Sequence, residues 1–316
     1  MMQFNLHETQ AWLAQHHTNG VSLSMKELLY YQNKAALLDI SPKKAIQAKL
    51  AGSYLAKTKG RGMEFDEARH YQPGDDIRAI DWRVTARTGK THTKLYREEK
   101  ERPVFVLCDL SKSMHFGTEL LFKSVQAAHL TSLLAWAAKN HGDRIGGLLF
   151  NQSQHLEFKP QTRQKSVLAL LNGLIKVHSS AATNKNTEIT FADSCARLRR
   201  LARPGSMVFL ISDFTQMNET AKRHLSRLSR HCELVAYKVS DSFEHQLPQA
   251  KVVQQVALTD GVQNQTLLLG EQKTATHYQQ EYNKRNNQVV KALEQCRAKV
   301  IQLNAGIPLE QQLVGR

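Results

Sequence analysis

The sequence lacks any long hydrophobic run. Its densest apolar stretch, residues 130–138, is short and contains Thr131 and Ser132, whereas a membrane-spanning helix needs roughly 18 or more consecutive apolar residues. The first eight residues have neither the basic region nor the hydrophobic block of a signal peptide. Both observations favour a soluble, cytoplasmic protein.

Cysteine is scarce, and motifs built on it are missing. The four cysteines are Cys108, Cys195, Cys232 and Cys296, and each falls within an apolar strand or helix pattern. Because no two of them are close in sequence, a zinc knuckle and a redox motif are excluded. We expect reduced cysteines in the core.

The motifs of several enzyme classes are also absent. The sequence has no phosphate-binding G-x-x-x-x-G-K-[S/T] loop and no G-x-G-x-x-G turn between a strand and a helix. None of its 14 histidines forms a His-x-x-x-His pair beside suitable zinc ligands. The loop after Asp109 begins like that of a haloacid-dehalogenase phosphotransferase, but Ser111 stands where that chemistry needs a second carboxylate. With no visible pair of nucleophile and base, we expect a protein that is not an enzyme.

Positive charge, by contrast, is abundant. The 316 residues carry a formal net charge of +15, with basic clusters at 57–61, 197–203 and 222–230. The last two clusters lie on predicted amphipathic helices, whose charged residues usually form the solvated face. We therefore expect an acidic protein partner, with direct nucleic-acid binding as the alternative.

Strand and helix patterns alternate along the last two thirds of the chain. Apolar strand patterns cover 104–108, 144–150, 206–212, 234–239 and 299–303, with helical patterns at 118–140, 163–177, 188–202, 217–231 and 278–293. This alternation predicts an α/β fold with a doubly wound, mostly parallel sheet. The expected parts are N-terminal helices (1–48), a β-rich subdomain (49–100), the α/β domain (101–305) and a C-terminal tail (306–316).

Oxygen-bearing side chains follow two of the buried strands. Asp109, Ser111 and Ser113 come directly after the first, and Asp213 ends a second strand about a hundred residues later. Carboxyl ends of parallel strands meet at one edge of a sheet, and carboxylate and hydroxyl oxygens suit Mg²⁺. The sequence therefore predicts a site for Mg²⁺, or Mn²⁺, at this edge.

A threonine from the loop before residue 188 is the expected fifth ligand. Thr187 is the first choice, Thr190 the second and Thr183 the third. Threonine and aspartate at such turns also cap helices very often, so the simpler interpretation is a metal-free scaffold of the same fold.

A longer pattern adds a family resemblance. Residues 60–87, GRGMEFDEARHYQPGDDIRAIDWRVTAR, together with Ile211-Ser-Asp-Phe at 211–214, resemble the hallmark of the bacterial domain of unknown function 58 family. Members of that family carry a von Willebrand factor type A-like domain, and the resemblance extends over roughly residues 50 to 305. The five positions Asp109, Ser111, Ser113, Thr187 and Asp213 are similar to a metal-ion-dependent adhesion site (MIDAS). Relatives tend to have a Thr-Asp pair where this chain has Thr187-Glu188.

The resemblance implies a non-catalytic binding protein. Such proteins are thought to act with MoxR-type AAA+ ATPases in chaperone-like assembly or stress responses. The partner, a MoxR-type ATPase or its client, would complete the metal shell with an Asp or Glu, and the positive charge of the chain would attract it.

The charged residues of the hallmark are expected to pair with one another. Its carboxylates (Glu64, Glu67, Asp75, Asp76 and Asp81) have arginines as neighbours, at 69, 78, 83 and 87. Internal ion pairs and turns explain them more simply than a nuclease-like carboxylate set does. Trp82 is expected to be a packing anchor.

Overall fold

The computed structural model describes residues 6–40, 63–98, 101–180, 188–248, 253–259 and 264–313. The chain divides into two compact units. One comprises residues 1–43 and 102–316, and the other comprises residues 44–101. Each unit is described by itself below.

A six-stranded sheet forms the centre of the larger unit. Its order is β10–β7–β6–β3–β4–β5, and every neighbouring pair is parallel except β4 and β5. The bounds are β3 Pro103–Asp109, β4 Arg144–Phe150, β5 His155–Gln161, β6 Met207–Ser212, β7 Glu233–Ser240 and β10 Ala298–Asn304. The central strands β3 and β6 are buried almost throughout, as their continuous apolar sequences predict for strands covered on both faces.

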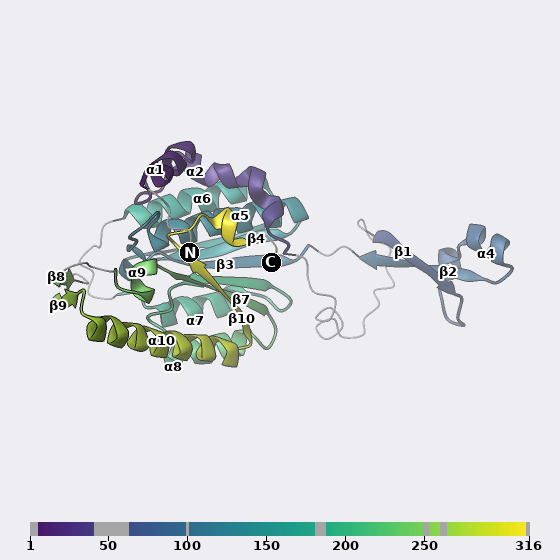
Figure 1. Ribbon diagram of the computed structural model, residues 1–316. Helices are drawn as coiled ribbons and strands as arrows, with labels where there is room; N and C mark the ends of the chain where they lie inside the picture. Colours follow the sequence, from purple (N-terminus) through teal and green to yellow (C-terminus); the bar gives the residue numbers. More distant parts are fainter. Residues whose placement is uncertain are drawn as a thin grey trace. The chain divides into compact units, whose positions relative to one another are not determined.

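Helices cover both faces of this sheet (Figure 1). On one face lie α2 (Met25–Tyr30), the 3-10 helix η1 (Tyr31–Leu37), α5 (Lys123–His141), α6 (Gln164–Ser179) and α11 (Leu309–Leu313). On the other lie α7 (Phe191–Leu201), α8 (Glu219–Leu228) and α10 (Gln272–Gln295). The predicted doubly wound, mostly parallel α/β fold is confirmed.

Helix α5 is buried on nearly every side, from Lys123 to Ala138. One side lies against the sheet, and the N-terminal helices cover another. The hydroxyl of Tyr31 lies 3.1 Å from Nδ1 of His129, and Ser132 donates from Oγ to the carbonyl oxygen of Leu28 at 2.6 Å. The N-terminal helices, which also include α1 (Leu6–Gln15), therefore belong to the larger unit.

The ends of the α/β domain differ from the expected parts. The helical segment expected as residues 1–48 is grouped with the α/β domain through residue 43. Residues 306–316, expected as a tail, contain α11, whose Leu309 and Leu313 are buried in the main core. Apolar residues spaced four apart place both side chains on one face of this short helix, which is why it packs.

The smaller unit contains an antiparallel pair of strands, β1 (Met63–His70) and β2 (His92–Glu98), with η2 (Ile77–Ala79) and α4 (Trp82–Thr88) between them. Arg69 and Asp75 form a 2.7 Å ion pair, and Asp81 caps α4. The expectation for Trp82 is wrong, because its side chain is 67% exposed. It follows the Asp81 cap at the first position of α4.

The remaining elements are η3 (Lys112–Met114), α9 (Ser242–His245) and the antiparallel pair β8 (Gln254–Thr259) and β9 (Asn264–Leu269). The pair Asp260-Gly261, which favours a two-residue hairpin turn, lies outside the described residues. Across the described ranges, no helix combines the length and hydrophobicity needed to cross a bilayer.

Substitution of Leu28 by Ala tests whether the N-terminal helices fold with the α/β domain. Leu28 is fully buried in the main core, so its truncation should lower the free energy of unfolding by about 2–5 kcal/mol. Urea unfolding followed by circular dichroism measures this. Val21→Ala, at a 48% exposed position, is the control and should change stability by less than about 0.5 kcal/mol. Equal effects of the two substitutions would show that the N-terminal helices are not part of the cooperative core.

Candidate functional site

The parallel pairing of β3 and β6 determines the location of the candidate site. Cys108 of β3 is opposite Ile211 of β6, so the residues that follow, Asp109 and Asp213, leave the same edge of the sheet. Both carboxylates are buried, with 2% and 4% of each residue exposed.

Asp109 is held by donors from both strand ends. The backbone N–H of Ser111 donates to its Oδ1 at 2.9 Å, and the hydroxyl of Ser212 donates to its Oδ2 at 2.6 Å. Ser212 in turn accepts the backbone N–H of Phe214 at 2.9 Å. These bonds fix both carboxylate oxygens of Asp109 at the end of β3.

A chain of hydroxyls links the two aspartates. Oγ of Ser111 lies 3.3 Å from Oγ of Ser113, and Oγ1 of Thr215 lies 3.4 Å from the same Ser113 oxygen. Thr215 also donates to Oδ1 of Asp213 from its N–H at 3.0 Å and its hydroxyl at 2.9 Å. We call these five residues, Asp109, Ser111, Ser113, Asp213 and Thr215, the cup.

Backbone conformation at Phe214 makes this turn possible. Its φ of 57° lies in the left-handed region, which is unusual for a bulky residue. The side chain of Phe214 is buried against Phe191, with ring centroids 5.6 Å apart. Packing therefore supports a strained turn that directs Thr215 back onto Asp213.

A buried ammonium lies beside the cup. Nζ of Lys123, at the start of α5, donates to Oδ2 of Asp213 at 2.9 Å and to Oε1 of Glu244 at 2.6 Å. Lys123 is 1% exposed. A charge buried this deeply requires such partners, so Lys123 joins the start of α5 to the ends of β6 and β7.

The two aspartates differ in electrostatic environment. Burial, and then the neighbouring charge of Asp213, raise the pKa of Asp109 to about 6. For Asp213, burial acts in the same direction, but the Lys123 ammonium and the Thr215 donors outweigh it and lower the pKa. Burial acts to lower the pKa of Lys123, yet the carboxylates of Asp213 and Glu244 raise it. Asp109 is thus the carboxylate whose negative charge is least compensated.

The donor set fits a divalent cation. In an octahedral shell with contacts near 2.1 Å, neighbouring oxygens lie about 3.0 Å apart, close to the hydroxyl spacings of the cup. A cation there would also offset the charge of Asp109. In the described ranges, no group of three or more His, Cys, Asp or Glu side chains is arranged to hold a metal. The fit therefore depends on hydroxyls as much as on carboxylates.

The structure brings together four of the five predicted ligands: Asp109, Ser111, Ser113 and Asp213. Thr187, the first choice for the fifth, and Thr183 lie outside the described residues. Thr190 caps α7 instead, because its hydroxyl accepts the Asp193 N–H at 3.1 Å and donates to the Asp193 carboxylate at 2.7 Å.

Four residues of this region were missed by the sequence analysis: Lys123, Ser212, Thr215 and Glu244. Asp213-x-Thr215 repeats the spacing of Asp109-x-Ser111, a signal that could have identified Thr215. A single lysine at the start of an otherwise apolar helix pattern was the signal for Lys123. Nothing in the sequence indicated that Glu244 would reach it.

Asp109→Asn tests the unbalanced charge in protein kept metal-free with EDTA. The folded-state pKa of about 6 exceeds the unfolded value of about 3.9. The proton on Asp109 therefore stabilises the fold below about pH 4, and this contribution is lost as the pH rises through 6. Asparagine cannot ionise, so at about pH 7.5 the variant should be more stable than the wild type by about 2–3 kcal/mol.

Urea unfolding of both proteins between about pH 4.5 and 7.5 measures this difference, in which other titrating groups cancel. Asp193→Asn is the control. Hydrogen bonds from Thr190 lower the pKa of Asp193. That carboxyl is therefore ionised in both the folded and the unfolded chain over this range, and the stability change of its substitution should be nearly independent of pH. A stability difference for Asp109→Asn that does not change with pH would contradict the assignment.

Comparison with known proteins identifies relatives. The profile of the family described as "Protein of unknown function DUF58" matches residues 67–290. Uncharacterized proteins of Mycobacterium tuberculosis and Mycobacterium bovis are 29% identical over 211 residues, 67% of this chain. The chain spans 65% of the length of these curated relatives.

Two solved structures are similar at low identity. BatB from Bacteroides thetaiotaomicron has a TM-score of 0.42 and 12% identity, covering 67% of this chain and 97% of that one. The VWA domain of SpRpn10 has a TM-score of 0.35 and 10% identity, covering 68% and 94%.

Proposed function

We propose that this chain, which belongs to the DUF58 family and has a von Willebrand factor type A-like fold, is a non-catalytic protein-interaction module that uses a divalent cation. Asp109, Ser111, Ser113 and Asp213 would hold Mg²⁺ or Mn²⁺, with Thr215 or the predicted Thr187 as a further oxygen donor. The cation would supply an electrophilic position for a carboxylate of the partner.

The observation that carries this proposal is that closely spaced hydroxyls lie beside Asp109, the carboxylate whose negative charge is least compensated. The Ser113 hydroxyl lies 3.3 Å from that of Ser111 and 3.4 Å from that of Thr215. These hydroxyls lie beside the buried carboxylate of Asp109, whose pKa is raised to about 6 by burial and by Asp213. Bringing a cation to this position offsets the repulsion between the carboxylates. A hard cation with so few anionic ligands retains affinity for another carboxylate.

The partner proposed from the family resemblance is a MoxR-type AAA+ ATPase or its client, in chaperone-like assembly or a stress response. The net charge of +15 supports an acidic partner, because it would accelerate encounter with one.

A metal-free scaffold is the second candidate, and one observation favours it. Lys123 already neutralises Asp213 at 2.9 Å, which reduces the number of free carboxylates available to a cation. Calorimetric titration separates the two candidates.

We expect Mn²⁺ or Mg²⁺ titrated into the wild type to give saturable heat with one site. Ser113→Ala removes a central hydroxyl without changing charge and should weaken binding at least about 10-fold, or about 1.4 kcal/mol. Asp109→Ala should abolish binding.

Thr187→Ala and Thr215→Ala, compared in the same titration, identify the further oxygen donor. Thr190→Ala is the matched control, because its hydroxyl caps α7, and it should bind the cation like the wild type. Equal affinity of the wild type and Asp109→Ala, or no heat from the wild type, would favour the metal-free scaffold.

A further inference from the structure

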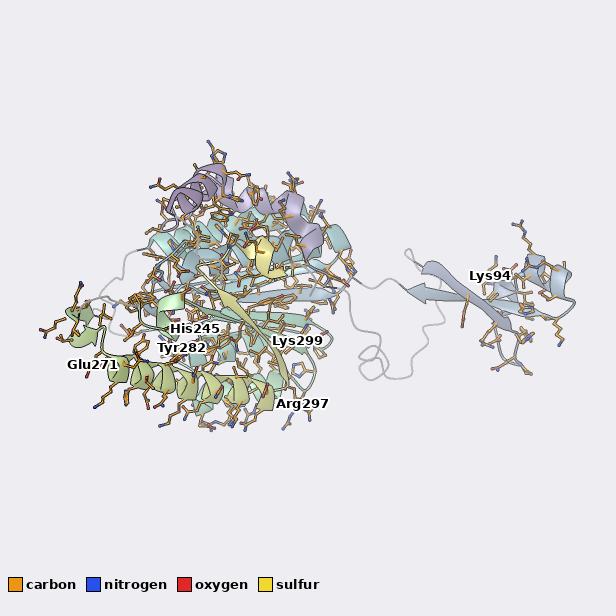
Figure 2. All side chains as sticks on the ribbon, viewed as in Figure 1. Lys94, His245, Glu271, Tyr282, Arg297 and Lys299 are labelled. Carbon is orange, nitrogen blue, oxygen red and sulfur yellow. The ribbon has the colours of Figure 1, made fainter. Side chains whose placement is uncertain are left out.

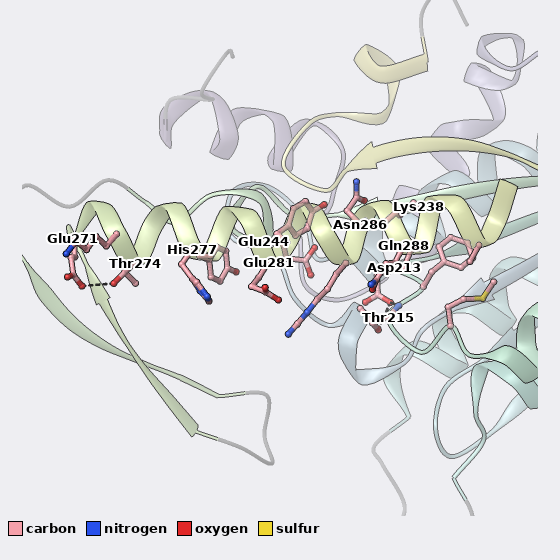
Figure 3. A pocket seen from close by; sticks show the side chains of 18 residues that line it. Asp213, Thr215, Lys238, Glu244, Glu271, Thr274, His277, Glu281, Asn286 and Gln288 are labelled. Atoms are coloured by element: carbon pink, nitrogen blue, oxygen red, sulfur yellow. Dashed lines mark hydrogen bonds between the residues drawn. The ribbon is translucent and has the colours of Figure 1, made fainter. Parts of the chain in front are cut away.

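A groove of about 1160 Å³ adjoins the cup (Figure 3). One wall is a face of α10, which contributes Tyr282, Arg285 and Asn286. The other is the carboxyl edge of the sheet, with Asp213 and Lys238 among its residues. Its volume is close to the upper end of the roughly 300–1,000 Å³ of small-molecule pockets, so the chemistry of the lining residues decides which ligand it suits.

Lys238 is a buried cation without a polar partner. It is 6% exposed and continues the side of β7 on which Leu234 and Ala236 enter the core beneath α10. Its Nζ lies 5.5 Å from the ring centroid of Tyr282, a residue of α10 that is labelled in Figure 2. Within the described parts of the chain, it forms neither a hydrogen bond nor an ion pair. Burial lowers the pKa of Lys238, and the charges of Glu244 and Asp213 offset this only in part.

The nearby carboxylates are already engaged. Asp213 and Glu244 both accept from Lys123, at 2.9 and 2.6 Å. Lys238 is therefore left facing the groove, which it lines together with Asp213 and Asn286 (Figure 3).

Two further groups at this end of the groove need partners. Arg285 is exposed and lines the groove, with no ion pair among the described residues. Oδ1 of Asn286 is buried and has no hydrogen-bond donor in the described chain. A ligand that satisfies these groups brings carboxylates for the two cations and an N–H donor for the amide oxygen. Among the lining carboxylates, Glu271 lies at the far end of α10 and accepts from Thr274, and Glu281 lies one turn before Arg285.

We propose that this groove binds an extended acidic segment of a partner protein, with one carboxylate on Lys238 and its backbone N–H groups available to Asn286. The inference rests on the proposed function for the class of partner, a protein, but it does not require the cation of the cup. A chain with a net charge of +15 repels a second copy of itself, which favours an acidic partner over self-association.

Selection from a displayed random dodecapeptide library on the intact chain in EDTA tests the proposal. The selected peptides should be enriched in Asp and Glu. Their affinity, measured by fluorescence polarisation of labelled copies, should fall at least 10-fold in Lys238→Gln and at least 3-fold in Arg285→Gln. Lys284→Gln is the matched control, because Lys284 is exposed on the same helix outside the groove lining, and it should bind like the wild type.

Peptides that bind Lys238→Gln and Arg285→Gln as tightly as the wild type would overturn the proposal, as would selection of no peptide. Arg285 is exposed, so its variant remains informative even if Lys238→Gln unfolds at a lower temperature. Wild-type dimers in light scattering that are absent in Lys238→Gln would identify a second copy as the occupant and overturn it too.

Repeating the binding with Mg²⁺, in the wild type and in Asp109→Asn, separates this inference from the cation. If the cup holds no cation, Mg²⁺ has no effect but the dependence on Lys238 remains. If the groove is not the binding surface, the dependence on Lys238 is lost whatever Mg²⁺ does.

Discussion

Repulsion between two buried carboxylates organises the carboxyl edge of the sheet. Parallel pairing of β3 with β6 leaves Asp109 and Asp213 at neighbouring strand ends, where burial makes their charges costly. Each is supplied with donors from the other's surroundings. Ser212, the last residue of β6, bonds Asp109, and Lys123 from the helix after β3 bonds Asp213. The site is therefore assembled by long-range contacts that hold only when the whole sheet has formed.

The negative charges of the two aspartates are compensated to different extents, and this difference allows the edge of the sheet to bind a cation or a proton. Asp213 shares the positive charge of Lys123 with Glu244, whereas Asp109 receives only hydrogen bonds from Ser111 and Ser212. The pKa of Asp213 is accordingly lowered, whereas the pKa of Asp109 is raised to about 6 by burial and by the charge of Asp213. The negative charge of Asp109 can be compensated in two ways, by a cation bound at the cup or by a proton on Asp109 itself.

Much of this arrangement was predictable because it follows from local patterns. Alternating apolar strand and helix patterns, beginning with β3 and the helix after it, predicted the parallel sheet. Because Asp109 and Asp213 each come at the end of a strand pattern, a parallel sheet places them at the same edge. The ion pair between Lys123 and Glu244 was not predictable, because the two residues are 121 positions apart and meet only through tertiary packing. The prediction that Trp82 is a packing anchor was wrong for a related reason. An aromatic side chain is buried only if other elements cover it, and Trp82 is 67% exposed.

The register between β6 and β7 links the cup to the groove. Ser212 lies opposite Lys238, so Asp213 and the unpaired ammonium occupy adjacent strand ends, and both line the groove. A partner segment lying along α10 would thus pass a cation site and an ammonium within one binding surface. Acidic residues at two positions of that segment would meet one positive group each, which increases specificity because a segment with a single carboxylate leaves one group unpaired. The alternation of β7, which places Lys238 where a core residue is expected, is then explained by binding, since the fold alone would be served better by an apolar side chain.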